Sequence, residues 1–369
     1  MRRIHIFTYI IYFIAIFLIL EFTFRTITPS YQRSIFSYDP RLIWKYVPNS
    51  NLKQGKFIFH HNISNPKISI NKLGFRDTNY IIESKKKRII FLGDSYTVGI
   101  AIPESDIFPR YLETKLNKNK IKNYEIINFA ITAYCTDQEY IVLKDIALKY
   151  KPKIVVLTVA PNDIRETYVK KLFYLENGEL KLNKINKAFN LNLKNRFVWY
   201  LSTKSEIFAR LKNIIGLNHG NFDYVLNNVT CGVFFHENKG YNVDEVLFLK
   251  NETDEMKEAV KLFTALIEEM NKICLNNDCK LIIVNLPIKI QFDGSLNNEV
   301  FDQLKIKKIL KNITSKNNIP LLDLHSTINN SKNPLDYYLG WDFHLSKEGH
   351  KLVGDELYRF LVNENLLIK

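Results

Sequence analysis

The sequence is poor in the residues that mark several classes of protein. Its 369 residues include only 13 Gly, 11 Pro and 4 Cys, and they contain no internal repeat or low-complexity tract. A collagen-like repeat, a disordered chain and a Cys-rich miniature scaffold are therefore excluded. Only one long apolar run occurs, which excludes a membrane protein with several spans. Hydrophobic residues make up 46% of the chain, enough for a large core.

The chain is basic, but its positive charge is dispersed. Lys and Arg number 52 against 38 acidic residues, which gives a formal net charge of +14. Much of the excess is Lys, scattered along a chain that is also rich in Asn and Ile. A nucleic-acid-binding surface needs clustered positive charge. We therefore expect no nucleic-acid partner.

The apolar run extends from Ile4 to Leu20 and follows Arg2 and Arg3. About 20 apolar residues cross a bilayer as a helix, and the two arginines favour a cytoplasmic N-terminus. A cleaved signal peptide, the alternative, needs small residues near the end of the run, and residues 21–25 offer none of that type. We expect residues 1–25 to be an uncleaved single-pass anchor, with the rest of the chain outside the cytoplasm.

The four cysteines indicate packed thiols. Cys274 and Cys279 are close enough in sequence to form one bridge, whereas Cys135 and Cys231 have no such neighbour. The spacing of the first pair, without a nearby His, is not that of a zinc site. We expect no metal and no organic cofactor.

The order of apolar segments predicts an α/β fold. Residues 26–85 are polar and irregular, and we expect them to form an arm packed on a main domain that spans residues 86–369. Short buried strands alternate with amphipathic helices in that domain, which predicts a parallel sheet with helices on both faces. The expected strands are 87–92, 126–129, 154–159, 281–286 and 320–324, and the expected helices are 104–116, 136–150, 256–273 and 346–361. An insertion at about 165–250, with an Asn-Gly hairpin at 174–182 and a helix at 196–215, interrupts the alternation.

A serine stands where the first of these strands turns into a helix. Ser95 follows Gly93-Asp94, so it is expected at the carboxyl edge of the sheet, where open α/β folds bind their ligands. A serine hydroxyl needs a base, and His344 lies in a loop before the last helix, with Ser346 as its cap. Asp342 is near enough to orient that imidazole, whereas His325 and His350 fit structural roles. Asn162, after the third strand, reaches the same edge and can donate to an oxyanion.

Together these residues resemble the SGNH (GDSL-type) hydrolases. The preceding segment 70–76, which ends in a Gly-Phe-Arg turn, resembles membrane-anchored bacterial members of that family. Segments 89–99, 128–134, 159–163 and 342–350 resemble the four blocks of that family. The resemblance implies a three-layer α/β/α fold with a parallel, flavodoxin-like sheet. It also implies that Ser95 is the nucleophile and His344 the base. The oxyanion hole would consist of the amides of Ser95 and Ala133 and the side chain of Asn162.

The sequence departs from the family pattern in two ways that concern the site. Ala133 stands where the family has its oxyanion Gly, and Ala160 likewise replaces a Gly. Alanine supplies the same backbone N–H, so its methyl matters only if φ is positive or substrate passes close by. In addition, one residue separates Asp342 from His344, where the family commonly has two. Either Asp342 or a backbone carbonyl could therefore orient His344.

These features predict an extracytoplasmic serine esterase. We expect it to remove acyl groups, acetyl above all, from cell-envelope glycans or lipids through a Ser-His(-Asp) acyl-enzyme. An O-acyltransferase on the same scaffold, and a non-catalytic glycan-binding protein on a degenerate hydrolase fold, are the alternatives. The expected partners are an acylated carbohydrate or lipid substrate and the membrane.

Overall fold

The computed structural model describes residues 2–27, 35–53, 67–99, 101–121, 123–184, 193–214, 233–236, 239–242, 244–340 and 342–367. The centre of the fold is a five-stranded parallel sheet in the order β13-β12-β7-β5-β6. Its strands are β5 (Lys87–Leu92), β6 (Tyr124–Asn128), β7 (Ile154–Val159), β12 (Lys280–Asn285) and β13 (Leu321–Asp323). This order is that of flavodoxin-like sheets, which confirms the expected fold class.

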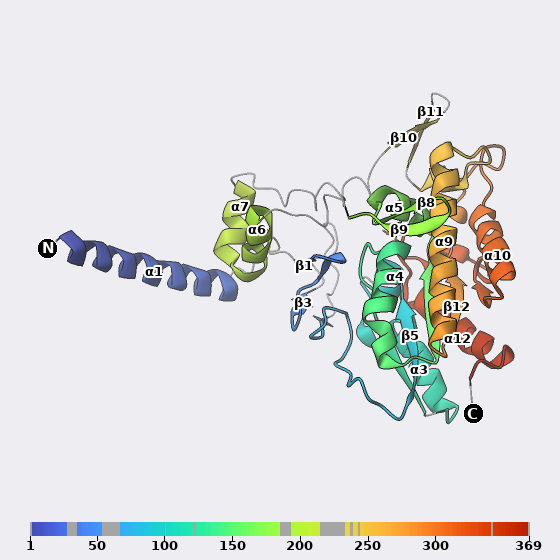
Figure 1. Cartoon of the computed structure of the whole chain (residues 1–369), viewed down its shortest axis with the longest axis horizontal. Coiled ribbons are helices and arrows are strands. Elements are labelled where there is room, and N and C mark those ends of the chain that lie inside the picture. Colours follow the sequence, from blue (N-terminus) through green and yellow to red (C-terminus); the bar gives the residue numbers. More distant parts are fainter. Residues whose placement is uncertain are drawn as a thin grey trace.

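Helices cover both faces of the sheet. The helices are α3 (Phe108–Lys118), α4 (Thr136–Asp145), α5 (Asn162–Lys170), α9 (Asp254–Asn276), α10 (Lys305–Asn317) and α12 (Lys347–Asn363). The chain turns back between β6 and β7, so right-handed crossovers place α3 on one face and α4, α9 and α10 on the other. Figure 1 shows α4 and α9 in front of the sheet, and α12 packs closely on α3.

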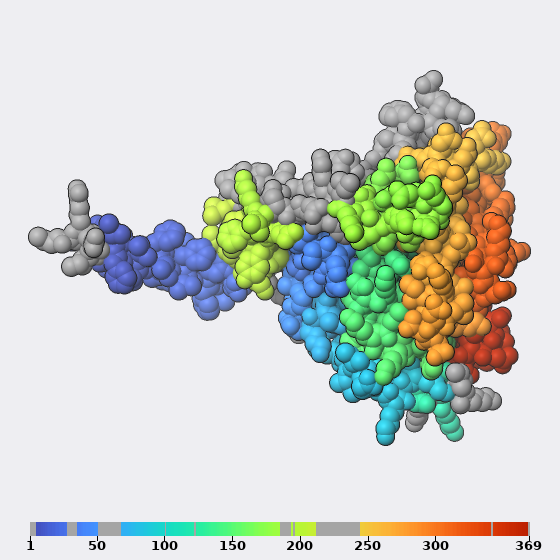
Figure 2. Space-filling view, viewed as in Figure 1, coloured from blue at the N-terminus to red at the C-terminus, as the bar shows by residue number. Residues whose placement is uncertain are grey.

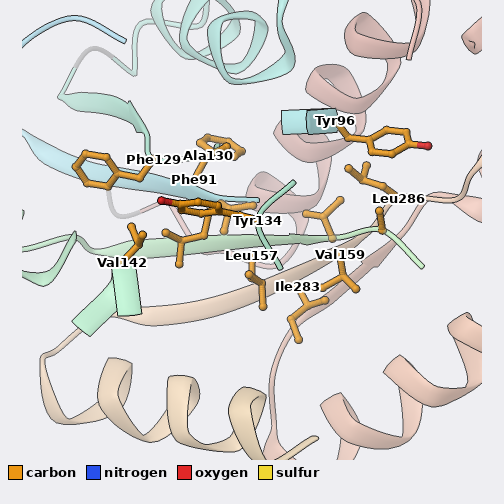
Figure 3. Packing of buried hydrophobic residues seen from close by; sticks show 14 of the residues in the cluster. Phe91, Tyr96, Phe129, Ala130, Tyr134, Val142, Leu157, Val159, Ile283 and Leu286 are labelled. Atoms are coloured by element: carbon orange, nitrogen blue, oxygen red, sulfur yellow. The ribbon is translucent and has the colours of Figure 1, made fainter. Parts of the chain in front are cut away.

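The sheet strands are buried because both of their faces are covered. All six residues of β7 are buried, as expected of an apolar run inside a parallel sheet. Figure 3 shows Val142 of α4 in the same cluster as Leu157 of β7 and Ile283 of β12. This core fixes the carboxyl ends of β5 and β7, the two neighbouring strands where the chain order switches direction.

Three predicted helices differ from the observed ones. The segment 104–116 begins with a 3₁₀ turn, Glu104–Asp106, and α3 starts at Phe108 because Pro109 favours a first helical turn. The segment 136–150 ends as α-helix at Asp145, where Ile146 leaves helical geometry, and continues as a 3₁₀ turn, Ala147–Tyr150. The helix expected at 196–215 is two helices, α6 (Leu193–Lys204) and α7 (Glu206–Ile214).

The break between α6 and α7 has a local cause. The Ser205 hydroxyl oxygen accepts a hydrogen bond from the Phe208 N–H at 3.1 Å. Serine at such a position caps a new helix in preference to continuing the old one. The hydrophobic periodicity runs through the break, so the pattern alone predicts a single helix.

The described part of the insertion also contains two hairpins. β8 (Phe173–Glu176) and β9 (Glu179–Leu182) pair around Asn177 and Gly178, which both have positive φ, as the Asn-Gly signal predicts. β10 (Val233–His236) pairs with β11 (Lys239–Asn242). The cysteines Cys135, Cys274 and Cys279 are buried free thiols, and Cys231 lies outside the described residues.

The arm before the main domain contributes two small strand pairs. β1 (Phe36–Asp39) pairs with β2 (Ile43–Tyr46), and β3 (Asn51–Lys53) pairs with β4 (Lys67–Ser69). Trp44 of β2 is fully buried, and its Nε1 donates to the Thr132 carbonyl at 3.2 Å. Arg76, from the Gly-Phe-Arg turn, is also fully buried and donates to the carbonyls of Val98, Gly99 and Ile102. The arm thus holds two loops at the carboxyl edge of the sheet.

An apolar helix precedes the arm. α1 (Arg2–Thr26) contains one segment, His5–Thr26, that is long and apolar enough to cross a membrane, and almost none of it is buried. It projects away from the rest of the molecule, with α6 and α7 at its inner end (Figures 1 and 2). An apolar helix at this position has the features of a membrane anchor and of a signal sequence alike.

Candidate active site

Ser95 lies at the turn between β5 and the short helix α2 (Ser95–Val98). Asp94 caps this helix, because its Oδ1 accepts the Tyr96 N–H at 2.9 Å. Gly93 is required by close packing, since a Cβ there would lie 2.1 Å from Thr158 Oγ1 and 2.3 Å from Thr97 Oγ1. The turn is therefore tightly built, and it presents Ser95 at the carboxyl edge of the sheet.

The structure brings His344 to Ser95 across 249 positions of sequence. His344 Nε2 lies 2.8 Å from Ser95 Oγ, and its Nδ1 lies 2.7 Å from Asp342 Oδ1. The same carboxylate oxygen accepts the His344 backbone N–H at 3.1 Å. One imidazole is thus hydrogen-bonded to a hydroxyl on one side and to a carboxylate on the other.

The short spacing between Asp342 and His344 is compatible with this contact. Only Phe343 separates the two residues, and one oxygen, Asp342 Oδ1, contacts both the backbone N–H and Nδ1 of His344. Tyr96 OH donates to the Phe343 carbonyl at 3.2 Å, which ties the loop to α2. Partial burial raises the pKa of Asp342, but the hydrogen bonds and charge of His344 outweigh it, and the pKa lies below its ordinary value of 3.8. The carboxylate is therefore ionised at neutral pH.

Ala133 lies in the loop after β6, in the left-handed region with a φ of 61°. The Ile131 N–H donates to the Gly93 carbonyl at 3.2 Å, which places this loop beside the turn that carries Ser95. Ala133 therefore has the positive φ at which a methyl group affects the backbone. Left-handed geometry costs an L-residue about 1–2 kcal/mol, which the surrounding contacts must offset.

Asn162 is the first residue of α5 and lies beside the same turn. Its Nδ2 is 3.4 Å from Asp94 Oδ2 and 3.4 Å from Glu166 Oε1. Both hydrogen bonds are long and therefore weak. They hold the amide next to Ser95 while leaving it free to exchange partners.

A buried group of charged residues behind these side chains has no counterpart in the sequence-based prediction. Lys170 interacts electrostatically with Glu166 and with Asp137, and Asp94, Glu139 and Asp163 belong to the same group. Burial raises the pKa of Glu166 to about 7 and that of Asp137 to about 6, although Lys170 lowers both. Within the described ranges, no set of three or more His, Cys, Asp or Glu side chains could hold a metal ion.

A sequence signal for part of this group exists. Asn162, Glu166 and Lys170 follow one another at intervals of four residues, so they share one face of a helix. The prediction placed residues from 165 onward in an insertion, and this separated Glu166 and Lys170 from the site.

The histidines set aside from the site lie elsewhere in the core. His350, on α12, stacks on Phe108, and its Nδ1 accepts the Phe108 N–H at 3.3 Å. Burial lowers its pKa to about 3, and the nearby charge of Arg76 acts in the same direction. His325 is buried at the start of the short helix α11 (His325–Asn329).

A serine hydroxyl and a carboxylate thus lie within hydrogen-bond distance of the same imidazole at the carboxyl edge of a parallel α/β sheet. The sequence profile of the GDSL-like lipase/acylhydrolase family matches residues 91–352. The chain therefore belongs to this family, and it is a hydrolase of ester bonds. No curated protein matches the chain.

Several solved structures are similar to this chain at low identity. The crystal structure of TesA is 8% identical and has a TM-score of 0.43, covering 76% of this chain and 100% of its own. The lipase/acylhydrolase from Enterococcus faecalis is 13% identical, with a TM-score of 0.43 and coverages of 75% and 96%. The acetylxylan esterase Axe2 from Geobacillus stearothermophilus is 12% identical, with a TM-score of 0.42 and coverages of 76% and 96%.

Proposed function

We propose that this esterase is tethered to the membrane and removes acyl groups, acetyl above all, from cell-envelope glycans or lipids. The observation that carries the proposal is the position of His344, within hydrogen-bond distance of both Ser95 and Asp342. A nucleophile, a base and a group that orients the base are the three parts that acyl transfer through serine requires. A binding protein on a degenerate scaffold has no need to keep this contact.

In the first half of the reaction, His344 Nε2 accepts the Ser95 hydroxyl proton as Oγ attacks the ester carbonyl carbon. The imidazolium that forms is stabilised by the charge of Asp342. When the tetrahedral intermediate collapses, His344 returns the proton to the departing alcohol oxygen. The acyl group is then bound to Ser95 Oγ as an ester.

The tetrahedral intermediate carries its negative charge on the former carbonyl oxygen. The backbone N–H groups of Ser95 and Ala133 and the Asn162 amide are its donors in this mechanism. Asn162 would exchange its two weak contacts with Asp94 and Glu166 for the oxyanion. One well-placed donor of this kind contributes about 3–4 kcal/mol to transition-state stabilisation.

In the second half, water takes the place of the alcohol. His344 removes a proton from the water, which attacks the acyl carbon, and the same proton then returns to Ser95 Oγ. The products are the free alcohol, a carboxylic acid and the original enzyme. Every proton step uses the one imidazole.

Three features support an envelope substrate and an extracytoplasmic site. The apolar helix α1 follows Arg2 and Arg3, the arrangement that favours a cytoplasmic N-terminus. The net charge of +14 favours contact with anionic glycans and lipid headgroups. Phe343 is half exposed next to His344, with ring centroids 4.4 Å apart, and it offers an apolar surface to an acyl chain or sugar ring.

The test is acetate release from O-acetylated envelope glycans and lipids by the full chain, with p-nitrophenyl acetate as a reference ester. We expect wild-type enzyme to hydrolyse the reference ester and at least one envelope substrate, and Ser95→Ala to hydrolyse none. Hydrolysis that survives in Ser95→Ala would contradict the mechanism. Transfer of the acyl group to an added sugar hydroxyl, in preference to water, would identify the chain as an acyltransferase.

A further inference from the structure

The strongest unassigned feature is the ammonium group of Lys170. Lys170 is buried at the end of α5, and its Nζ donates to the Ala133 carbonyl at 2.6 Å. It also donates to Cys135 Sγ at 3.0 Å and to Gln138 Oε1 at 3.1 Å. All three acceptors belong to the loop after β6 and the beginning of α4. One side chain therefore fixes the loop that carries Ala133.

Both peptide groups that flank Ala133 are hydrogen-bonded to buried side chains. Lys170 binds the carbonyl of the peptide that follows Ala133. Trp44 Nε1 binds the Thr132 carbonyl at 3.2 Å, and this carbonyl shares a peptide plane with the Ala133 N–H. The Lys170 ammonium also lies over the Trp44 ring, 5.2 Å from its centroid. These contacts fix the direction of the Ala133 N–H although its φ is unfavourable for alanine.

Lys170 also reaches Asn162, the third donor of the oxyanion hole. Its Nζ lies 3.5 Å from Glu166 Oε2, and Glu166 Oε1 accepts the Asn162 amide at 3.4 Å. Because the three residues are spaced four apart on α5, a rigid helix face connects them. The Lys170 ammonium is thus linked to two of the three oxyanion donors, the Ala133 N–H and the Asn162 amide.

We propose that Lys170 is a positioning residue for the oxyanion hole, which aligns the Ala133 N–H directly and the Asn162 amide through Glu166. This role rests on the proposed function of those two donors. Misplacement of a catalytic donor by about 1 Å costs about 100-fold in rate, so a modest shift of two donors is visible in kcat. Lys170 does not touch substrate, and its loss leaves ground-state binding unchanged.

The test compares Lys170→Met with a matched control, Lys305→Met, in the full chain. Lys305 is also a buried lysine that donates to a backbone carbonyl, that of Leu249 at 2.6 Å, and pairs with a carboxylate, Glu252 at 3.2 Å. It belongs to α10 and has no contact with the site residues. We expect Lys170→Met to lower kcat for p-nitrophenyl acetate by about 10- to 100-fold with KM unchanged, and Lys305→Met to leave kcat unchanged.

A second variant keeps the test decisive if Lys170→Met does not fold. Trp44→Phe retains a ring but removes the Nε1–H that binds the Thr132 carbonyl, and we expect it to lower kcat with KM unchanged. The role of Lys170 is overturned if folded Lys170→Met keeps kcat within twofold of wild type or loses no more than Lys305→Met. If Lys170→Met does not fold, Trp44→Phe with kcat within twofold of wild type overturns the claim that these buried contacts align the Ala133 N–H. Absence of hydrolysis by wild-type enzyme would instead contradict the proposed function.

A different part of the molecule carries a second inference. The inner end of α1 is bound to the junction of α6 and α7: Glu21 accepts hydrogen bonds from the Glu206 and Ile207 N–H groups at 2.9 and 3.1 Å. Arg25 donates to the Lys204 carbonyl, and the Arg210 guanidinium lies over the Phe24 ring at 4.5 Å. The two helices are therefore fixed at the end of the apolar helix, and Figure 1 shows them standing across its axis.

The outer face of α6 is apolar and exposed. Leu193, Phe197 and Tyr200 are 82%, 61% and 58% exposed, and their spacing puts them on one face of the helix. The opposite face is held by Trp199, whose Nε1 donates to the Phe36 carbonyl at 2.7 Å. Lys194, Arg196 and Lys204 are exposed beside the apolar face. Apolar residues flanked by cations are typical of a helix that lies in the headgroup region of an anionic bilayer.

We infer that this face of α6 lies on the surface of the anionic bilayer that α1 enters, an inference that rests on the proposed tether. The test places the photo-crosslinker p-benzoylphenylalanine at position 197 of the full chain, in vesicles that contain phosphatidylglycerol. Position 13, within α1, and position 275, 65% exposed at the end of α9, are the references. We expect lipid adducts at positions 13 and 197 and none at 275.

Other crosslinking patterns would contradict either the inference about α6 or the tether. Adducts at position 13 without adducts at 197, or crosslinks from 197 to a second copy of the chain, would overturn the inference about α6. No lipid adduct at position 13 would contradict the tether itself.

Discussion

Replacing Asp342 by Asn tests whether this carboxylate orients and stabilises His344. The change keeps the size of the side chain but removes its charge. A hydrogen bond to a charged group contributes about 1.5–3 kcal/mol and a neutral one about 1 kcal/mol. The lost charge therefore costs about 0.5–2 kcal/mol in the transition state, or about 2- to 30-fold in kcat. If the new amide turns its NH₂ group toward Nδ1, the imidazole takes the wrong tautomer, and the loss rises toward about 10⁴-fold.

The assay is steady-state hydrolysis of p-nitrophenyl acetate, with Asp336→Asn as the control. Asp336 is an exposed carboxylate that precedes the same loop and has no contact with His344. Because the pKa of Asp342 lies below its ordinary value, the carboxylate is charged from about pH 5 upward, and the rates of the wild type and the two variants are compared above that pH. Asp342→Asn with more than half of the wild-type kcat would refute the reasoning and would favour a backbone carbonyl as the orienting group.

Three further changes test the local physics of the site. Ala133→Gly should keep kcat within about threefold, because the backbone N–H remains. It should also raise the free energy of unfolding in denaturant titrations by up to about 1 kcal/mol, since relief of the left-handed strain exceeds the added chain entropy. A tenfold gain in kcat would show instead that the methyl group obstructs substrate. Gly93→Ala should lower the free energy of unfolding by about 1–3 kcal/mol or more, because its Cβ would overlap Thr158 and Thr97. The same overlap should lower kcat. Unchanged thermal denaturation would contradict that packing. His350, with a pKa lowered from 6.5 to about 3, binds fewer protons folded than unfolded, so its contribution to stability is lost as pH falls from about 6.5 to about 3, by up to about 1.4 kcal/mol per pH unit. His350→Gln should flatten this part of the stability profile, and an identical profile in the variant would show that the group does not titrate as described.

The sheet and the nucleophile turn were predictable because they depend on local patterns. The strand Lys87–Leu92 ends in four apolar residues and Ile154–Val159 is apolar except for one threonine, and the observed boundaries equal the predicted ones. A Gly-Asp-Ser turn after such a strand points to the carboxyl edge whatever the rest of the fold does. Periodicity did not reveal the break at Ser205, since a side-chain cap leaves the apolar pattern intact.

The surroundings of the site were less predictable because they depend on contacts between distant segments. Whether Asp342 reaches Nδ1 across one intervening residue depends on how its loop closes, so the sequence predicted Asp342 as the orienting group but left a backbone carbonyl as an alternative. The contact of Trp44 with the Thr132 peptide joins positions 88 residues apart, and no spacing rule links them. The four-residue spacing of Asn162, Glu166 and Lys170 indicated a shared helix face. It indicates a role at the site only once the Ala133 loop is known to lie against Lys170.

The most direct test of the account is covalent labelling of the full chain with a fluorophosphonate, followed by mass spectrometry of its peptides. The account predicts one adduct, on Ser95, that is absent from Ser95→Ala and forms far more slowly in His344→Ala. An adduct on another serine, or labelling of Ser95 at the same rate without His344, would contradict the claim that these two residues form the reactive pair.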